Sequence, residues 1–191
     1  MDADRPLLTV ITPVLNGAEH LSRCLASVAS LSRGSGVRIE HIVADGGSTD
    51  GSLQIAQRAL ASDTSPVCVV LEGPDRGQSD AINRGAAVAR GDWVGWLNAD
   101  DWFEPGAQSV VHELRRAAED GIDLVVGRCR FVDAEGSTVY SPSPPDLGSP
   151  AELLRPLSRW FAGRCIVQPE AFVRREAFGR VGGLDVDNHF A

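Results

Sequence analysis

The chain has 191 residues, of which 43% are hydrophobic and 23% charged, so it can form a folded domain with a substantial core and is not a disordered chain. Its 18 basic and 26 acidic residues give a net charge of −8, which argues against general adhesion to nucleic acid or anionic lipid. Every basic residue is arginine. The absence of lysine excludes mechanisms that need a side-chain amine, such as Walker-A phosphate binding and Schiff-base chemistry.

The cysteines and the first residues indicate the cellular compartment in which we expect the protein. Cys24, Cys68, Cys129 and Cys165 lie far apart, with no CxxC pair and no histidine at zinc-finger spacing, so we expect buried thiols in a reducing compartment. The acidic start Met1–Asp4 is unlike a signal peptide, and no apolar run approaches the roughly 18 residues of a membrane helix. We therefore expect a cytoplasmic protein without a membrane span.

In the first half of the chain, apolar runs of strand character alternate with helical patterns. Leu7–Val14 (LLTVITPV) is rich in β-branched residues, and Asn16 follows it as the expected cap of a helix that ends near Gly34. Val67–Leu71 (VCVVL) is fully apolar, which is typical of a strand buried in a parallel sheet. The other strands expected here are Val37–Ala44 and Trp93–Leu97, and the other helices are Ser52–Ala61 and about Ser79–Arg90.

The second half predicts a smaller, partly antiparallel region. Pro105 suits the first turn of a helix whose apolar positions continue to Ala118. Segments Asp123–Val132 and Thr138–Tyr140 flank the turn Ala134–Ser137 and predict a hairpin. Short helical patterns follow at Ala151–Ala162 and Arg175–Val181. The whole predicts an α/β fold: a mostly parallel central sheet flanked by helices, with a small antiparallel extension.

Polar residues follow four of the predicted strands. Ligands of open α/β sheets bind beyond the carboxyl ends of the strands, so we expect these segments to share one cleft. Each segment alone also has a structural explanation, as a helix cap, a turn or a solvated loop. The four segments are Thr12–Asn16, Asp45–Gly51, Asp75–Asp80 and Asn98–Asp101.

Their carboxylates point to a metal. Two acids in contact repel each other by about 4 kcal/mol at an effective dielectric constant near 20, and they would repel a phosphate as well. A divalent cation removes this conflict, and hard oxygen ligands favour Mg²⁺ or Mn²⁺ over Zn²⁺. We therefore expect a divalent metal, Mn or Mg, as cofactor.

These motifs, taken in order, resemble the family 2 glycosyltransferases, which have the GT-A (Rossmann-like) nucleotide-sugar-binding fold. The resemblance implies a single domain over 1–191, with a donor-binding part at about 1–104 and an acceptor-side part at about 105–191. The segments that carry it are Thr12–Asn16 (TPVLN), Asp45–Ser52 (DGGSTDGS), Pro74–Gly85 (PDRGQSDAINRG), Gly91–Asp101 (GDWVGWLNADD) and Arg174–Asp185 (RREAFGRVGGLD).

The resemblance also implies roles for single residues on the donor side. Thr12, Pro13 and Asn16 would line the pocket for the base and ribose, and Asp45 would bind the base or the ribose. A glycine would let the loop after the third strand approach the donor closely. The residues that would border the donor site are Asp75, Gly77, Asp80, Asn83 and Arg84.

The metal and the acceptor side follow from the same resemblance. Asn98, Ala99 and Asp100 stand at the family's DxD motif, which resembles a clamp for a metal and a diphosphate. Asp100 and Asp101 would hold the metal, while Gln168 and Trp102 would lie on the acceptor side. The implied partners are a nucleoside-diphosphate sugar, with a UDP-sugar favoured, and a carbohydrate or lipid-linked acceptor.

Three departures from the family pattern change these expectations. Asn98 replaces the first acid of DxD, so Asp100 carries more of the metal binding. Many relatives have two acids where this chain has Asp45-Gly46, which leaves the identity of the base open. The usual catalytic base lies a little beyond the Gly-Gly-Leu-Asp block, so we expect it beyond Ala191, with His189 as the only nearby substitute.

The mechanism implied is an inverting single displacement at the anomeric carbon, in which a base removes the acceptor hydroxyl proton and the metal stabilises the leaving diphosphate. Two other functions stay open. A hydrolase could be drawn around Ser79, in a segment like a nucleophile elbow, although Ser79 does not directly follow a strand. A binding or scaffold module that holds a sugar nucleotide or a partner protein without catalysis is favoured by Asn98 and by the missing base.

Overall fold

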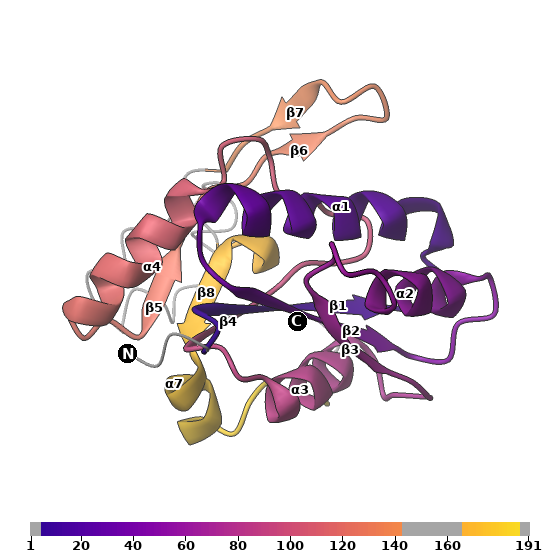
Figure 1. Ribbon diagram of the computed structural model, residues 1–191, viewed down its shortest axis with the longest axis horizontal. Coiled ribbons are helices and arrows are strands. Elements are labelled where there is room, and N and C mark those ends of the chain that lie inside the picture. The colour runs from indigo at the N-terminus through magenta and orange to yellow at the C-terminus, as the bar shows by residue number, and fades with distance from the viewer. Residues whose placement is uncertain (1–4, 143–165, 188–191) are drawn as a thin grey trace. The chain divides into compact units, whose positions relative to one another are not determined.

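A computed structural model describes residues 5–142 and 166–187 of the chain. Its main feature is a six-stranded sheet with the strand order β3-β2-β1-β4-β8-β5, flanked by helices (Figure 1). The predicted α/β class with a mostly parallel sheet and an antiparallel hairpin is confirmed. The strands are β1 Leu8–Val14, β2 Ile39–Asp45, β3 Val67–Leu71, β4 Trp93–Trp96, β5 Leu124–Val126, β6 Phe131–Val132, β7 Thr138–Tyr140 and β8 Ala171–Arg174. The helices are α1 Ala18–Ser35, α2 Ser52–Leu60, α3 Gln78–Val88, α4 Ser109–Glu119, the 3₁₀ helix η1 Gln168–Glu170 and α7 Arg175–Arg180.

The centre of the sheet is parallel and buried. Strand β1 pairs with β2 from Leu8 opposite Ile39 to Val14 opposite Asp45, and it pairs with β4 on its other edge. Every residue of β1 and β2 is buried, as expected for strands covered on both faces. The carboxyl ends of β1 and β2 therefore lie at the same level, which places the loops that follow them side by side.

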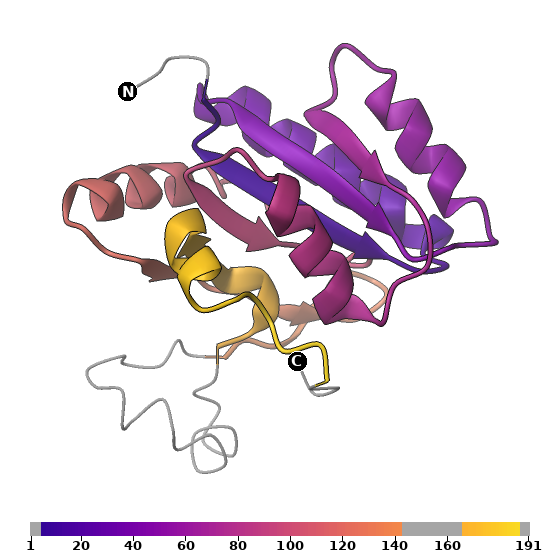
Figure 2. The ribbon, with the colours of Figure 1, turned by 90° about the horizontal axis from the view of Figure 1, so that it is seen from below.

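Helices cover the two faces of the sheet. Val10, Cys24 and Val111 share one core cluster, which joins β1 to α1 and α4 on one face. On the other face, Ile11 and Ile82 join β1 to α3 in a second cluster, to which α7 also contributes. Figure 2 shows α3 and α7 together on the side of the sheet away from α1. No helix in the described ranges is long and apolar enough to cross a bilayer.

Several predicted boundaries change in the structure. Strand β3 is an edge strand in which Cys68 is exposed, so the predictions of a fully buried strand and of buried thiols throughout are wrong here. Pro105 lies in a turn, and α4 begins only at Ser109, because the segment before it folds into turns rather than a helix.

The predicted strand 123–132 is in fact two short strands. Its first part, β5, lies at the edge of the main sheet, and only β6 pairs with β7 in the hairpin. Strand β8 was not predicted at all, and it pairs antiparallel with β4, placing Val94 opposite Val173. The antiparallel extension therefore includes part of the main sheet as well as the hairpin.

The chain contains two compact units, one formed by 1–125 with 172–191 and the other by 126–171. The first carries the sheet and its helices. The second contains the hairpin β6–β7, whose turn is closed by a hydrogen bond from Asp133 N–H to the Ser137 carbonyl at 3.0 Å, and it also contains η1. The predicted helix at 151–162 falls outside the described residues, and the division of the chain at about 104 into donor and acceptor parts stays a prediction.

Candidate functional site

The loops that follow β1 and β2 are tied to each other at the carboxyl edge of the sheet. Gly46 N–H donates to the Val14 carbonyl, and Asn16 N–H donates to Ser48 Oγ, each at 2.9 Å. The Asn16 side chain in turn accepts a hydrogen bond from Thr49 N–H at 2.9 Å. Asn16 has a φ of 54°, in the left-handed region that asparagine tolerates better than most residues. The prediction that Asn16 caps α1 is therefore wrong, because its side chain holds the second loop instead.

The first amides of α1 are capped by the loop after β2. Ser52 Oγ accepts from Gly17 N–H and Asp50 Oδ2 accepts from Ala18 N–H, both at 2.9 Å. The Ser52 hydroxyl and then the Ala18 amide hold the pKa of Asp50 below its usual value. A carboxylate of the protein thus already occupies the positive end of this helix, where a phosphate could otherwise bind.

Asp45 is buried at the end of β2, with 1% of its surface exposed. Its Oδ1 accepts hydrogen bonds from Gly47 N–H and Ser48 N–H, both at 2.9 Å, while its buried Oδ2 has no hydrogen-bond partner in the described part of the chain. The neighbouring Gly46 lies against Asp75 of the loop after β3, since a Cβ on Gly46 would be 2.7 Å from Asp75 Oδ2. Two predicted site residues from different loops, Asp45 and Asp75, thus flank one glycine.

Arg84 and Asp80, both predicted at the donor border, shape the loop after β3. The Arg84 guanidinium donates to the carbonyls of Glu72 and Gly73 at 3.0 Å each. Asp80 accepts a hydrogen bond from Arg76 N–H at 3.1 Å. Gly77 stands directly before α3 with a φ of 112°, a conformation that favours glycine, and its expected close approach to the donor stays a prediction. These contacts fix the loop in place at the sheet edge.

The acidic segment after β4 lies beside the start of α3. Asn98 Oδ1 accepts a hydrogen bond from Gln78 Nε2, and the Asn98 carbonyl accepts one from Asp101 N–H at 3.0 Å. Asp100 is exposed, whereas Asp101 is half-buried. Burial and then the charge of Asp100 raise the pKa of Asp101 to about 6, against a smaller opposing effect of a hydrogen bond with Asn98. This carboxyl therefore takes up a proton close to neutral pH.

The fit of a divalent metal can be judged from these donors. Within residues 5–142 and 166–187, no group of three or more His, Cys, Asp or Glu side chains is arranged to hold a metal ion. Asp100 and Asp101 offer adjacent hard oxygen donors, and the elevated pKa of Asp101 shows unfavourable negative charge that a cation would relieve. The residues suit a metal that takes its other ligands from a diphosphate and from water.

The two predicted acceptor-side residues lie in different units. The Arg23 guanidinium stacks over Trp102, 3.3 Å from the ring centroid, so one face of this ring is already covered. Gln168 begins the 3₁₀ helix of the second unit.

Three predicted nucleotide-site residues have side chains that are buried or already hydrogen-bonded within the protein. Thr12 and Pro13 are buried, and Thr12 Oγ1 lies 2.9 Å from His41 Nε2 and 3.6 Å from Cys24 Sγ. Asn83 uses its side chain to bind the backbone of Leu184. Thr12 shares one face of β1 with Val10 and Val14, and this face packs against α1. As placed, the side chains of Thr12 and Pro13 offer no surface for a ligand, and that of Asn83 is occupied.

Leu15 is a site candidate that the sequence analysis did not single out. It is 62% exposed, between buried Val14 and Asn16 with its positive φ. A large apolar side chain held in solvent at this edge can pack against the flat face of an aromatic ligand. The sequence feature that could have identified it is a leucine directly after the predicted strand and before the turn of the loop that follows.

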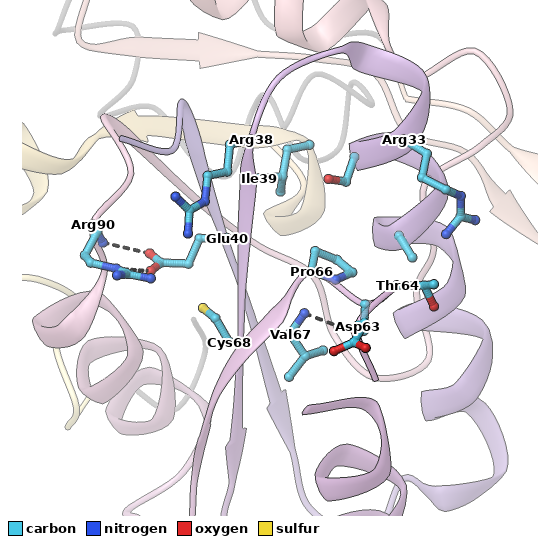
Figure 3. A pocket seen from close by; sticks show the side chains of 13 residues that line it. Arg33, Arg38, Ile39, Glu40, Asp63, Thr64, Pro66, Val67, Cys68 and Arg90 are labelled. Carbon is cyan, nitrogen blue, oxygen red and sulfur yellow. Dashed lines mark hydrogen bonds and ion pairs between the residues drawn. The ribbon is translucent and has the colours of Figure 1, made fainter. Parts of the chain in front are cut away.

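A cavity of about 310 Å³ lies at the other end of the sheet, near the first residues of β2 and β3 (Figure 3). Its Glu40 is 2% exposed and accepts hydrogen bonds from Arg90 N–H and Arg90 Nε at 2.7 Å, and from Thr9 Oγ1 at 2.6 Å. This charge is satisfied within the protein. Ligands of α/β sheets bind at the opposite ends of the strands, so the cavity is not the predicted donor site.

The hydrolase alternative loses its structural basis. Ser79 lies within the first turn of α3 and is 7% exposed, rather than on a sharp turn directly after a strand.

Comparison with known proteins settles the family. The model of "Glycosyl transferase family 2" matches residues 9–182, which includes all four strand-end segments. The chain belongs to glycosyl transferase family 2. The resemblance drawn from the sequence motifs is thereby confirmed.

Two curated proteins illustrate the relationship. This family 2 chain is 38% identical over 96 residues to a "PGL/p-HBAD biosynthesis glycosyltransferase" of Mycobacterium bovis, a match that covers 50% of the chain and 36% of that protein. It is 33% identical over 181 residues to the "O-antigen biosynthesis protein RfbC" of Myxococcus xanthus, covering 94% of the chain but 13% of that protein. The chain thus spans well under half the length of either relative.

Solved structures show the same GT-A fold. Residues 1–349 of TarS from S. aureus, in complex with UDP, match 96% of the chain with a TM-score of 0.71 and 18% identity, and the match covers 52% of that structure. A mannosyltransferase from Pyrobaculum calidifontis, in complex with GDP-Man and Mn²⁺, matches 96% of the chain with a TM-score of 0.65 and 21% identity, covering 48% of that structure.

Proposed function

We propose that this family 2 member binds a nucleoside-diphosphate sugar at the carboxyl edge of β1, β2, β3 and β4 and transfers its sugar to an acceptor hydroxyl. The observation that carries the proposal is the direct linkage of these loops. Asn16 joins the first to the second, Gly46 packs on Asp75 of the third, and Gln78 joins the start of α3 to Asn98 after β4. A donor bound at this edge could contact all four loops at once.

The charges of the side chains at this edge indicate where the diphosphate and the nucleoside of the donor would lie. A diphosphate is repelled by carboxylates unless a cation lies between them, so it belongs at Asp100 and Asp101, the two residues suited to a metal. The nucleoside then extends toward Asp45, Asp75 and the exposed Leu15. When bound, Mn²⁺ or Mg²⁺ would neutralise the charge that develops on the departing diphosphate.

The finer parts of the proposal come from the sequence resemblance. They are a UDP-sugar as donor, a hexosyl group transferred with inversion, and a carbohydrate or lipid-linked acceptor, as in polysaccharide biosynthesis. The resemblance gives Trp102 and Gln168 as the candidate residues on the acceptor side. The complexes of two solved relatives with UDP and with GDP-Man and Mn²⁺ support a nucleotide donor and a divalent metal. The reaction also requires a base that removes the proton of the acceptor hydroxyl.

A thermal-shift titration with UDP and GDP, each with and without Mn²⁺, tests donor binding. A ligand at 100 times its Kd should stabilise the fold by about 2.7 kcal/mol, which is readily measured as an increase in Tm. We expect a shift that requires both the nucleotide and the metal. Identical melting curves under all conditions would contradict the proposed donor binding.

A donor-binding module without catalysis is a second candidate, because Asn98 contributes no charge where the motif has an acid and its side-chain oxygen already accepts a bond from Gln78. The same protein assayed for nucleoside-diphosphate release with a panel of acceptors separates the two functions. Release that depends on the acceptor supports the transferase, and binding without release supports the module.

A further inference from the structure

We propose that helix α1 positions the metal-binding acids, with Arg23 and Ser27 as positioning residues that hold the segment around Asp100 and Asp101 in place. The inference rests on the proposed function, because the metal belongs to that site. It is carried by contacts that fix this segment to α1 on both sides of the two acids.

Before the acids, the segment is fixed by Ala99. Its side chain is buried and shares a core cluster with Leu21 and Leu25 of α1. Gly17, directly before α1, leaves room for it, since a Cβ on Gly17 would lie 3.1 Å from Ala99 Cβ. The residue that precedes Asp100 is therefore packed against the beginning of α1.

After the acids, two side chains of α1 hold the chain. The Arg23 guanidinium lies over the Trp102 ring, 3.3 Å from its centroid. One turn further along the helix, Ser27 Oγ accepts a hydrogen bond from Phe103 N–H at 3.1 Å and donates one to the Cys24 carbonyl at 2.7 Å. Because the hydroxyl proton is used in the bond to Cys24, the oxygen is left as an acceptor for the Phe103 amide.

Cys24 gives separate support for acids that lie close to α1. Burial raises the pKa of its thiol to about 12 against an opposing hydrogen bond with Thr12, and the charges of Asp101 and Asp100 raise it further. Cys24 lies between Arg23 and Ser27 on the helix. The part of α1 that contacts the residues after the acids is thus also the part that the charges of the acids reach.

Positioning matters here because the two acids repel each other. In a loop that is free to move they would separate, and a cation would have to bring them together at a cost in entropy and in electrostatic energy. With both neighbouring positions fixed on α1, the carboxylates are held close before a metal binds. Asn98 supplies no charge, so the ordering of Asp100 and Asp101 contributes more to metal affinity than it would beside a third acid.

Arg23→Ala separates positioning from charge, because the two effects have opposite signs. Removal of a cation near the acids would, on electrostatic grounds alone, strengthen Mn²⁺ binding. Loss of positioning should instead weaken it about 10-fold, as is typical when a residue that orients a metal ligand is removed. The Mn²⁺ Kd is measured by calorimetry with UDP held at saturation, and Tm reports folding. Arg23→Lys, which keeps a cation over the ring, should retain most of the affinity.

Ser27→Ala tests the second contact without changing any charge, and we expect a similar loss of about 10-fold. Arg33→Ala and Ser30→Ala, which replace exposed residues of the same helix, are the matched controls and should bind Mn²⁺ like the wild type. Trp102→Ala should weaken Mn²⁺ binding as Arg23→Ala does. The double variant should lose no more affinity than Trp102→Ala alone, because both changes remove the same contact.

A merely structural role for α1 would lower the Tm of Arg23→Ala and Ser27→Ala and leave the Mn²⁺ Kd of the folded variants unchanged. That result, or tighter Mn²⁺ binding in Arg23→Ala, would overturn the inference, as would additive losses in the cycle of Arg23 and Trp102. If the wild-type protein with UDP bound no Mn²⁺, the proposed metal site itself would be wrong, and the role of α1 with it.

Discussion

The Asn83 side chain forms two hydrogen bonds with the backbone of Leu184. Its side-chain nitrogen donates to the Leu184 carbonyl at 2.8 Å, and its side-chain oxygen accepts from Leu184 N–H at 2.9 Å. Gly183 allows this approach, because a Cβ there would lie 2.5 Å from Asn83 Oδ1. The asparagine of α3 thereby holds the segment that follows α7, although the motif in which it stands had suggested a donor contact.

Replacing Asn83 with alanine should destabilise the protein without affecting the nucleotide site. Two hydrogen bonds would be lost and two backbone groups of Leu184 would need new partners, so we expect a loss of about 2 kcal/mol in the free energy of unfolding. Urea denaturation measures this loss, with the exposed Gln54→Ala in α2 as control. Unchanged stability together with weaker UDP binding would instead place Asn83 at the donor.

Replacing Asp100 with asparagine should remove the metal dependence of nucleotide binding. Asp100 is the exposed acid of the segment after β4, and Asn98 cannot supply a second full charge to a cation. We expect Mn²⁺ to enhance UDP affinity at least 10-fold in the wild type and hardly at all in Asp100→Asn, as measured by calorimetry. Asp120→Asn, an exposed acid at the end of α4, should behave like the wild type. If Mn²⁺ enhanced UDP affinity equally in Asp100→Asn and Asp120→Asn, the metal assignment would be wrong.

Asp101 should make stability depend on pH. Burial and the charge of Asp100 raise its pKa from 3.8 to about 6, so the folded protein holds this proton more tightly than the unfolded chain does. The stability gained from the proton is complete below the unfolded value and is lost as the pH rises through about 6. Compared with the wild type, Asp101→Asn should therefore gain in Tm between pH 4 and pH 7. A constant difference in Tm over this range would show that Asp101 does not titrate there.

The Glu40–Arg90 pair should stabilise the fold only when Glu40 is ionised. Burial acts to raise the Glu40 pKa, but hydrogen bonds from the Arg90 backbone, Thr9 and the Arg90 side chain outweigh it and lower the pKa below 4.5. This stability is present above that value and is lost as the pH falls through the folded pKa. Arg90→Ala should lower the free energy of unfolding at pH 7 and lower it less near pH 3, where Glu40 takes up a proton.

Arg58→Ala, an exposed arginine of α2, is the control for Arg90. Denaturation curves of both variants at the two pH values make the comparison. A loss from Arg90→Ala that is the same at both would show that the arginine acts through packing rather than through its bond to Glu40.

The sequence was sufficient where structure follows from local pattern. Strands β1 and β2 with helix α2 fall within one or two residues of their predicted bounds, because continuous apolar runs and helical spacing are local properties. The convergence of the four polar segments also follows from local pattern, since parallel strands end at the same edge of a sheet.

Distant contacts explain what the sequence analysis missed. Ala171–Arg174 forms a strand because β4 has an unpaired edge beside it, a condition that no property of these four residues reveals. Asn16 takes its role from Thr49, which lies 33 residues further along the chain. The burial of Thr12, in contrast, could have been predicted, because it shares one face of β1 with the apolar residues Val10 and Val14.

The position of β8 has a consequence for how the protein is synthesised. Strand β4 is complete at Trp96, but the strand that covers its second edge begins only at Ala171. On a ribosome this interval lasts on the order of ten seconds, during which Trp93, Val94 and Gly95 lack the partner strand that β8 later provides. An exposed edge of this kind can pair with another nascent chain. Chaperone dependence of this protein should therefore be concentrated in the period before residue 174 emerges.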